Sequence, residues 1–173
     1  MKCITISGSA GHGKDTFANN LKKHLEISNH KVCIFHYADY IKMIAKEIYE
    51  WDGNKDFKGR SILQKLGDNI RSKDKMIIVN ELVKVLEIVE NDFDIALIPD
   101  SRFPIEIDAI KDKWETICVH INRINYMNNL TDEQKKHITE TSLDTYTYDI
   151  SYDIEENIFN DYSKELLNKL KLL

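Results

Sequence analysis

Proline and cysteine are both scarce in this chain of 173 residues. The only prolines, Pro99 and Pro104, lie within five positions of each other, so the sequence has no proline-rich linker. The three cysteines stand far apart in apolar, strand-like runs and have neither the spacing of a zinc site nor that of a disulfide framework. We therefore interpret Cys3, Cys33 and Cys118 as buried structural thiols.

Signals for membranes and for secretion are also lacking. No apolar run approaches the roughly 18 residues of a membrane span, and the N-terminus has no signal-peptide pattern. With 24 basic and 29 acidic residues the net charge is −5, which excludes a general electrostatic attraction to nucleic acid or to an anionic membrane. We expect a cytoplasmic protein that binds neither of them directly.

Arginine is rare too, at 4 of the 24 basic residues. A planar guanidinium group suits phosphate better than the point charge of lysine does, so each arginine is a candidate phosphate ligand. We interpret Arg60 as a solvated helix end and keep Arg71, Arg102 and Arg123 as candidates.

Short apolar runs alternate with amphipathic stretches along the whole chain. The pattern predicts strands over 2–7, 31–37, 93–98, 116–121 and 149–154, and helices over 14–27, 41–49, 62–70, 79–89, 103–111 and 159–170. Such alternation is typical of βαβ units. We therefore expect a single α/β domain over 1–173, a three-layer, doubly wound parallel sheet of about five strands with helices on both faces.

The loops at the carboxyl ends of the strands are the ones expected to bind ligands. They follow Ser7, Tyr37, Ile98 and Ile121. Two longer segments stand out beside them. The helical stretch 38–92 exceeds what one crossover needs, and 122–147 begins with a polar run poor in apolar residues that we expect to form a mobile loop or lid.

A glycine-rich loop follows the first predicted strand and precedes the first predicted helix. It matches G-x-x-x-x-G-K, a pattern whose backbone N–H groups form a nest for phosphate, with a lysine that reaches the β- and γ-phosphates. The helix that follows directs its positive N-terminal end at the same point. The predicted ATP- and phosphate-binding residues are Gly8, Ser9, Ala10, Gly11, His12, Gly13, Lys14, Asp15 and Thr16.

Asp15 stands where the common pattern has serine or threonine. A carboxylate next to polyphosphate is repelled unless a metal ion or ordered water lies between them, so we assign Asp15 to a Mg²⁺ shell and Thr16 to a phosphate contact. The alternative is that Asp15 only stabilises the positive end of its helix.

A second polar cluster, Asp100-Ser101-Arg102, ends the third predicted strand. In P-loop proteins an aspartate at this position holds Mg²⁺, usually through water, and we assign Asp100 that role. Arg102 faces the same crevice and is a candidate for stabilising the transferred phosphoryl group. Alternatively, Asp100 caps the next helix and Arg102 pairs with Glu106.

These two clusters together resemble the deoxynucleoside monophosphate kinases of bacteriophages. Gly-Lys-Asp-Thr at 13–16 and Asp-Ser-Arg-Phe-Pro at 100–104 are similar to the family's G-K-D-[ST] loop and its D-x-R-F-P-N-E segment. Weaker likenesses follow in the family's order at 37–42, 63–71 and 137–140, so the resemblance spans most of the chain. Ile105 stands where the family usually has asparagine, and Thr139 replaces a serine.

The resemblance implies an enzyme that transfers a phosphoryl group from ATP to a deoxynucleoside monophosphate, with Mg²⁺ as cofactor. It also implies a location in a host cytoplasm and a possible homodimer. The catalytic residues it implies are Lys14, Arg102 and Arg123, the last as a lid cation; the acceptor would be bound by Asp39, Lys42, Gln64, Arg71, Asp100 and Arg102, and the metal by Asp15 and Asp100.

Other readings remain open from the residues alone. Kinases of phosphomevalonate, shikimate or dephospho-coenzyme A also use compact P-loop domains, and a nucleotide-gated binding module would need the same loop. Structural alternatives exist for the secondary site residues as well: Asp39 as a helix N-cap, Lys42 as a surface charge, Arg71 as a helix end and Arg123 as the flank of a strand.

Overall fold

The computed structural model describes residues 1–54, 56–128, 130–155 and 158–172. Residue 55 falls in the predicted acceptor-binding segment 38–92 and residue 129 in the predicted lid 122–147, so both lie outside the described residues.

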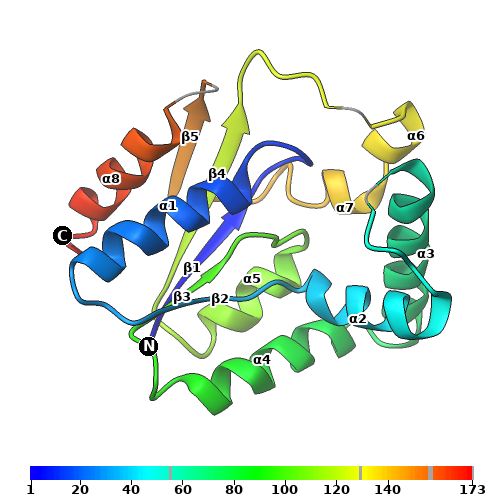
Figure 1. The fold of residues 1–173 in the computed structure, drawn as a ribbon, viewed down its shortest axis with the longest axis horizontal. Coiled ribbons are helices and arrows are strands. Elements are labelled where there is room, and N and C mark those ends of the chain that lie inside the picture. The colour runs from blue at the N-terminus through cyan, green and yellow to red at the C-terminus, as the bar shows by residue number, and fades with distance from the viewer. Residues whose placement is uncertain (55, 129, 156–157, 173) are drawn as a thin grey trace.

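Five parallel strands form one sheet at the centre of the molecule (Figure 1). They are β1 (Lys2–Ser7), β2 (Val32–Ile34), β3 (Ile95–Ile98), β4 (Thr116–Arg123) and β5 (Ile150–Ile154). Their order across the sheet is β2-β3-β1-β4-β5, and every adjacent pair is parallel. This confirms the doubly wound α/β fold predicted from the alternation of strands and helices.

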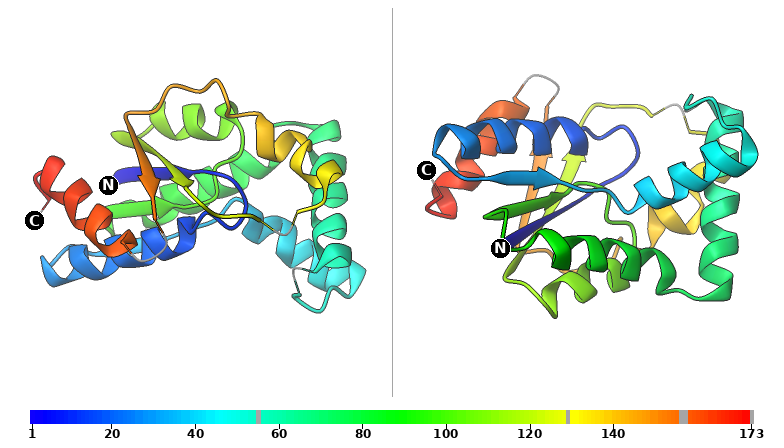
Figure 2. Two further views of the ribbon diagram at one scale, coloured as in Figure 1. Left: turned by 90° about the horizontal axis from the view of Figure 1, so that it is seen from above. Right: turned by 60° about the horizontal axis from the view of Figure 1, so that its bottom comes forward.

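Helices cover both faces of the sheet (Figure 2). One face carries α1 (Lys14–Ile27) and α8 (Phe159–Lys169), and the other carries α4 (Ile77–Val89) and α5 (Pro104–Lys111). Helices α2 (Ala38–Tyr49) and α3 (Phe57–Lys73) extend beyond the carboxyl edge of the sheet, together with the short α6 (Asp132–Lys135) and α7 (Ile138–Thr141).

The strands divide the apolar residues between two buried clusters. Because successive side chains of a strand point to opposite faces, Cys3 packs with the α4 and α5 side while Ile4 and Ile6 pack against α1 and α8. The cysteines are buried and unpaired with one another, as predicted. Among the described residues, no helix has the length and apolar character that crossing a membrane requires.

The second strand is shorter than the sequence predicts. The expected strand ran over 31–37, but β2 ends at Ile34, and only the N–H of Phe35 still bonds to Leu97 of β3. Further along the chain, the N–H groups of Tyr37 and Ala38 do not bond to β3. They donate instead to the carboxylate of Asp100. The chain therefore turns into α2 before the expected helix start.

Two short helices lie in the segment 122–136 and just after it, where a polar loop was expected. A capping box begins α6: the Thr131 side chain accepts from the N–H of Gln134, and the Gln134 side chain accepts from the N–H of Thr131. Helix α7 begins at the side chain of His137, which accepts from the N–H of Thr139. Local capping thus overrides the low apolar content of this stretch.

Candidate active site

The candidate site lies where the winding of the sheet reverses. The chain leaves β1 for α1 on one face and leaves β3 for α5 on the opposite face, although β1 and β3 are neighbours. The loops that follow these two strands therefore part from each other and leave a crevice at the carboxyl edge, where doubly wound sheets bind ligands. Both polar clusters of the sequence meet at this crevice.

Glycine is required at two points of the first loop. Gly8 has φ 146°, and a Cβ there would lie 2.2 Å from the carbonyl oxygen of Ile121 in β4. Gly13 has φ 84° and is the residue from which α1 begins. These conformations bend the chain tightly between β1 and α1, as a phosphate-binding nest requires.

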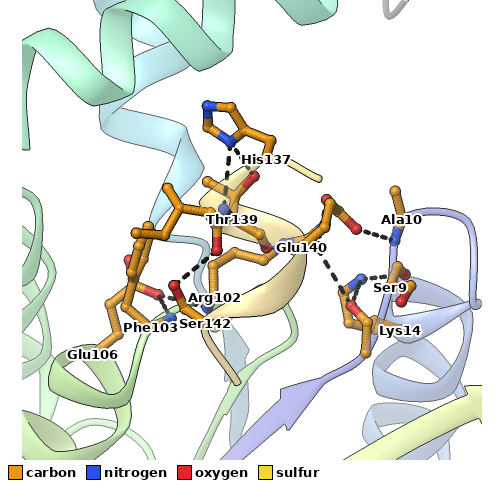
Figure 3. A network of polar contacts seen from close by, with 12 residues as sticks. Ser9, Ala10, Lys14, Arg102, Phe103, Glu106, His137, Thr139, Glu140 and Ser142 are labelled. Carbon is orange, nitrogen blue, oxygen red and sulfur yellow. Dashed lines mark hydrogen bonds and ion pairs between the residues drawn. The ribbon is translucent and has the colours of Figure 1, made fainter. Parts of the chain in front are cut away.

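Lys14 lies under this loop with only 8% of its surface exposed. Its Nζ donates to the carbonyl oxygens of Gly8 and Ser9, at 2.8 and 2.9 Å (Figure 3). Burial, with the nearby charge of Arg102, lowers the pKa of Lys14 from 10.5 to about 7. The structure therefore holds a desolvated amine at the position predicted to meet the β- and γ-phosphates.

The two aspartates predicted to hold Mg²⁺ line one cavity. Asp100 accepts from the N–H groups of Tyr37 and Ala38, at the start of α2. The alternative that it caps the helix following its own strand, α5, is therefore wrong. Asp15 lies 2.9 Å from Nε2 of His36, and this hydrogen bond raises the pKa of His36.

Two carboxylates beside a phosphate nest fit Mg²⁺, which is usually held by one or two carboxylates together with phosphates and water. A larger cluster, of three or more His, Cys, Asp or Glu, is not found within the described residues.

Three guanidinium groups line the same cavity, which has a volume of about 370 Å³. They belong to Arg60, Arg71 and Arg102, and Lys14 and Lys42 add two amino groups. Arg60, which we interpreted as a solvated helix end, is half-buried in the first turn of α3 and also lines this cavity. The cavity is suited to an anion of high charge density.

Arg71 is fixed by the residues that begin α5. Its guanidinium stacks 4.3 Å above the ring of Phe103 and lies 3.6 Å from the buried carboxylate of Glu106. Burial raises the pKa of Glu106 to about 7, although Arg71 and the N–H groups of Arg102 and Phe103 favour its charged form. Only the backbone of Arg102 bonds to Glu106, so the predicted side-chain pair of these two residues is not formed.

The side chain of Arg102 turns instead toward the phosphate loop and α7. Its Nη1 lies 2.8 Å from Oε1 of Glu140, 3.3 Å from the carbonyl oxygen of Thr139 and 3.4 Å from that of Gly8 (Figure 3). Arg102 therefore joins the loops that follow β1 and β3.

Of the weaker predicted contacts, Lys42 lines this cavity and Gln64 lines a connected one of about 200 Å³. Asp39 pairs with Lys42 at 2.7 Å and is the second residue of α2, so the alternative that it caps that helix is wrong. Its carboxylate is exposed and lies 3.4 Å from His36, and Asp39 is not among the described residues that line either cavity.

Arg123 ends β4 on the other side of the phosphate loop. Its guanidinium stacks 4.2 Å above the ring of Tyr126, and its N–H donates to Nδ1 of His12. Arg123 is not among the described residues that line the arginine-rich cavity. Its role as a lid cation therefore stays a prediction. Tyr126 itself lies against Gly11 of the loop.

Sequence reasoning missed four residues that the fold brings to the site: His36, Arg60, Tyr126 and Glu140. His36 was placed inside the second strand because that strand was predicted three residues too long. A signal existed for Arg60, since rare guanidinium groups were already the candidates for phosphate contact. Glu140 was noted only through its resemblance to a family segment.

No model of a known protein family matches this sequence. No curated protein matches it either. Solved structures do match over nearly the whole chain. An APS kinase of Mycobacterium tuberculosis in complex with AMPPNP and APS has a TM-score of 0.54 at 12% identity, covering 98% of this chain and 97% of that one.

Two further kinases are similar to the same extent. Shikimate kinase from Aquifex aeolicus has a TM-score of 0.55 at 17% identity, covering 98% of this chain and 96% of its own. A sugar kinase from Janibacter sp. HTCC2649 has a TM-score of 0.56 at 10% identity, with 99% and 95% covered. At such low identity the likeness shows a shared fold and no more.

Proposed function

We propose that the protein is a kinase that transfers the terminal phosphoryl group of ATP to a deoxynucleoside monophosphate. One observation carries the proposal: Arg60, Arg71 and Arg102 line a single cavity that opens beside the glycine-rich loop and Lys14. Phosphoryl transfer needs a donor site and an acceptor site that touch, with cations at the junction. The cavity supplies that junction, and the fold supports a kinase.

The donor is expected in the loop from Gly8 to Lys14. The backbone of the loop cradles its phosphates, and the amine of Lys14, already withdrawn from water, meets the terminal ones. Mg²⁺ held by Asp15 and Asp100 would neutralise charge on the phosphates when bound.

The acceptor phosphate is expected between the arginines. Arg71 is held in place by Phe103 and Glu106, so its fork is oriented before the acceptor arrives. Asp39 and Lys42 border the sugar or base, and Gln64 in the connected cavity is a candidate for the base. A general base is unnecessary, because the acceptor is itself a phosphate anion.

The choice of a nucleotide acceptor is supported by the Asp-Ser-Arg-Phe-Pro segment at 100–104 and its resemblance to phage kinases. The guanidinium groups alone suit any small phosphorylated metabolite.

The test is ADP release, measured with ATP, Mg²⁺ and a panel of acceptors. The panel holds deoxynucleoside and ribonucleoside monophosphates, other phosphorylated metabolites, and shikimate as an acceptor without phosphate. We expect deoxynucleoside monophosphates to give the largest stimulation. Stimulation by another phosphorylated acceptor alone would replace the nucleotide, and slow hydrolysis with no acceptor dependence would indicate a nucleotide-gated binding module.

A further inference from the structure

The phosphate loop is bonded to a carboxylate that the sequence places far away. Oε2 of Glu140 accepts from the backbone N–H of Ala10 at 3.0 Å, across 130 positions of sequence. Its other oxygen, Oε1, lies 2.8 Å from Nη1 of Arg102. The side chain is 10% exposed, so both bonds are made largely out of water, where charge-assisted hydrogen bonds are strong (Figure 3).

Resting on the function proposed above, we infer that Glu140 is a positioning residue for phosphoryl transfer: it holds Arg102 against the phosphate loop at the junction of donor and acceptor. Arg102 has no other carboxylate partner among the contacts described, since Glu106 receives only its backbone N–H. The remaining partners of its Nη1 are carbonyl oxygens at 3.3 and 3.4 Å, which are weaker acceptors. The placement of the guanidinium therefore depends on Glu140.

Glu140 can perform this task because α7 is anchored at its start. The N–H of Thr139 donates to Nδ1 of His137, so the ring hydrogen lies on Nε2, which is 2.9 Å from a carboxylate oxygen of Asp68 in α3. This bond ties the single turn of α7 to the helix that carries Arg60 and Arg71. One short element thus connects the phosphate loop, Arg102 and the acceptor-side helix.

Removing the charge of Glu140 should lower turnover without weakening the binding of Mg²⁺-ATP. A carboxylate beside the loop repels phosphate, so removing its charge should leave the affinity for Mg²⁺-ATP unchanged or increase it. Removing the charge also releases the Arg102 guanidinium, and misplacement of about 1 Å lowers turnover by about 10- to 100-fold. A merely structural residue would lower both together as the fold weakens.

The experiment compares Glu140→Gln with the wild type for kcat, for KM of both substrates, and for Mg²⁺-ATP affinity by calorimetry. We expect kcat to fall by about 10- to 100-fold with the ATP affinity retained. Glu140→Asp, which keeps the charge on a shorter side chain, should restore part of kcat. The matched control is Glu133→Gln, an exposed glutamate of α6, which should behave as the wild type.

A double-mutant cycle separates positioning from structure. If Glu140 acts through Arg102, adding Glu140→Gln to Arg102→Ala should lower kcat no further, because the interaction is already lost. Three results would each overturn the inference. One is an additive loss of kcat in the double mutant, and another is a kcat within twofold of the wild type in Glu140→Gln. The third is a parallel loss of kcat, ATP affinity and melting temperature in Glu140→Gln. A wild-type protein inactive with every acceptor would instead defeat the proposed function, while calorimetry would still report the effect of Glu140 on ATP binding.

Discussion

Burial controls the charge of the ionisable side chains around the cavity. Lys14 and Glu106 are both buried, and burial moves the pKa of each toward neutrality from opposite directions. A guanidinium group, by contrast, is not deprotonated in proteins. At the scale of single residues, the site therefore combines the guanidinium groups of three arginines with two groups whose charge depends on the local environment.

Arg102→Ala tests the guanidinium group that lies at the glycine-rich loop. We expect kcat to fall by about 10²- to 10³-fold, because the transferred group loses a charge-stabilising donor, with KM for ATP little changed. Steady-state ADP release with the best acceptor measures it, and the exposed Lys84→Ala in α4 is the control for loss of one positive charge. Unchanged turnover in Arg102→Ala would show that this residue has only a structural role.

Glu106→Gln tests the buried carboxyl through the pH dependence of stability. Burial raises its pKa from 4.5 to about 7, so the folded protein holds this proton more tightly than the unfolded chain does. Its contribution to the free energy of unfolding is fully present below pH 4.5 and is lost as the pH rises to about 7, by up to about 3 kcal/mol. Glu106→Gln should lack this loss.

Urea unfolding at pH 5 and pH 8 measures the effect. The difference between the two pH values should be smaller in Glu106→Gln than in the wild type, whereas the exposed Glu26→Gln in α1 should keep the wild-type difference. Equal pH dependence in Glu106→Gln and the wild type would contradict the assignment of a raised pKa to Glu106.

At the scale of elements, the start of α3 forms the side of the cavity at which we propose that the acceptor binds. Asp56 caps the helix by accepting from the N–H of Gly59, and the Trp51 indole donates to the carbonyl oxygen of Asn54 beside it. A Cβ on Gly59 would lie 1.9 Å from that carbonyl oxygen. The first turn of α3, which carries Arg60, therefore packs directly on the preceding loop.

Gly59→Ala should displace this turn. We expect a loss of about 1–3 kcal/mol in the free energy of unfolding and a KM for the acceptor that rises more than the KM for ATP, because Arg60 moves while the phosphate loop does not. Urea unfolding and steady-state kinetics measure the two effects. The control is Ser61→Ala, an exposed position of the same helix. Wild-type stability and KM in Gly59→Ala would show that the turn accommodates the methyl group elsewhere.

Elements with strong local signals could be predicted from the sequence, and elements fixed by distant partners could not. The bounds of β1 and α1 match the prediction, because an apolar run and a four-residue apolar spacing meet at a glycine-rich turn. The predicted end of β2 was wrong because Asp100, far away in sequence, accepts from the N–H of Tyr37, the last residue of the predicted strand, and from that of Ala38. Helix α6 was missed although Thr131-x-x-Gln134 is a capping-box pattern.

At the scale of the whole molecule, the winding of the sheet assembles a site from segments that are separated in sequence. The phosphate loop and the Asp100–Arg102 cluster were predictable, because both follow strands whose carboxyl ends share one edge. The contact of Glu140 with Ala10 was not, since it spans 130 positions and depends on how the segment after β4 returns over the site. The place of Arg60 in the cavity was not predictable either, because it depends on the orientation of α3.

The central claim is that the glycine-rich loop and Lys14 bind the phosphates of ATP. Calorimetric titration of the wild type and of Lys14→Ala with Mg²⁺-ATP tests it most directly, with the melting temperature recorded in parallel. We expect saturable binding to one site in the range of about 1 μM to 1 mM, a rise in melting temperature, and at least tenfold weaker binding in Lys14→Ala. No heat and no change in melting temperature at millimolar ATP would contradict the account.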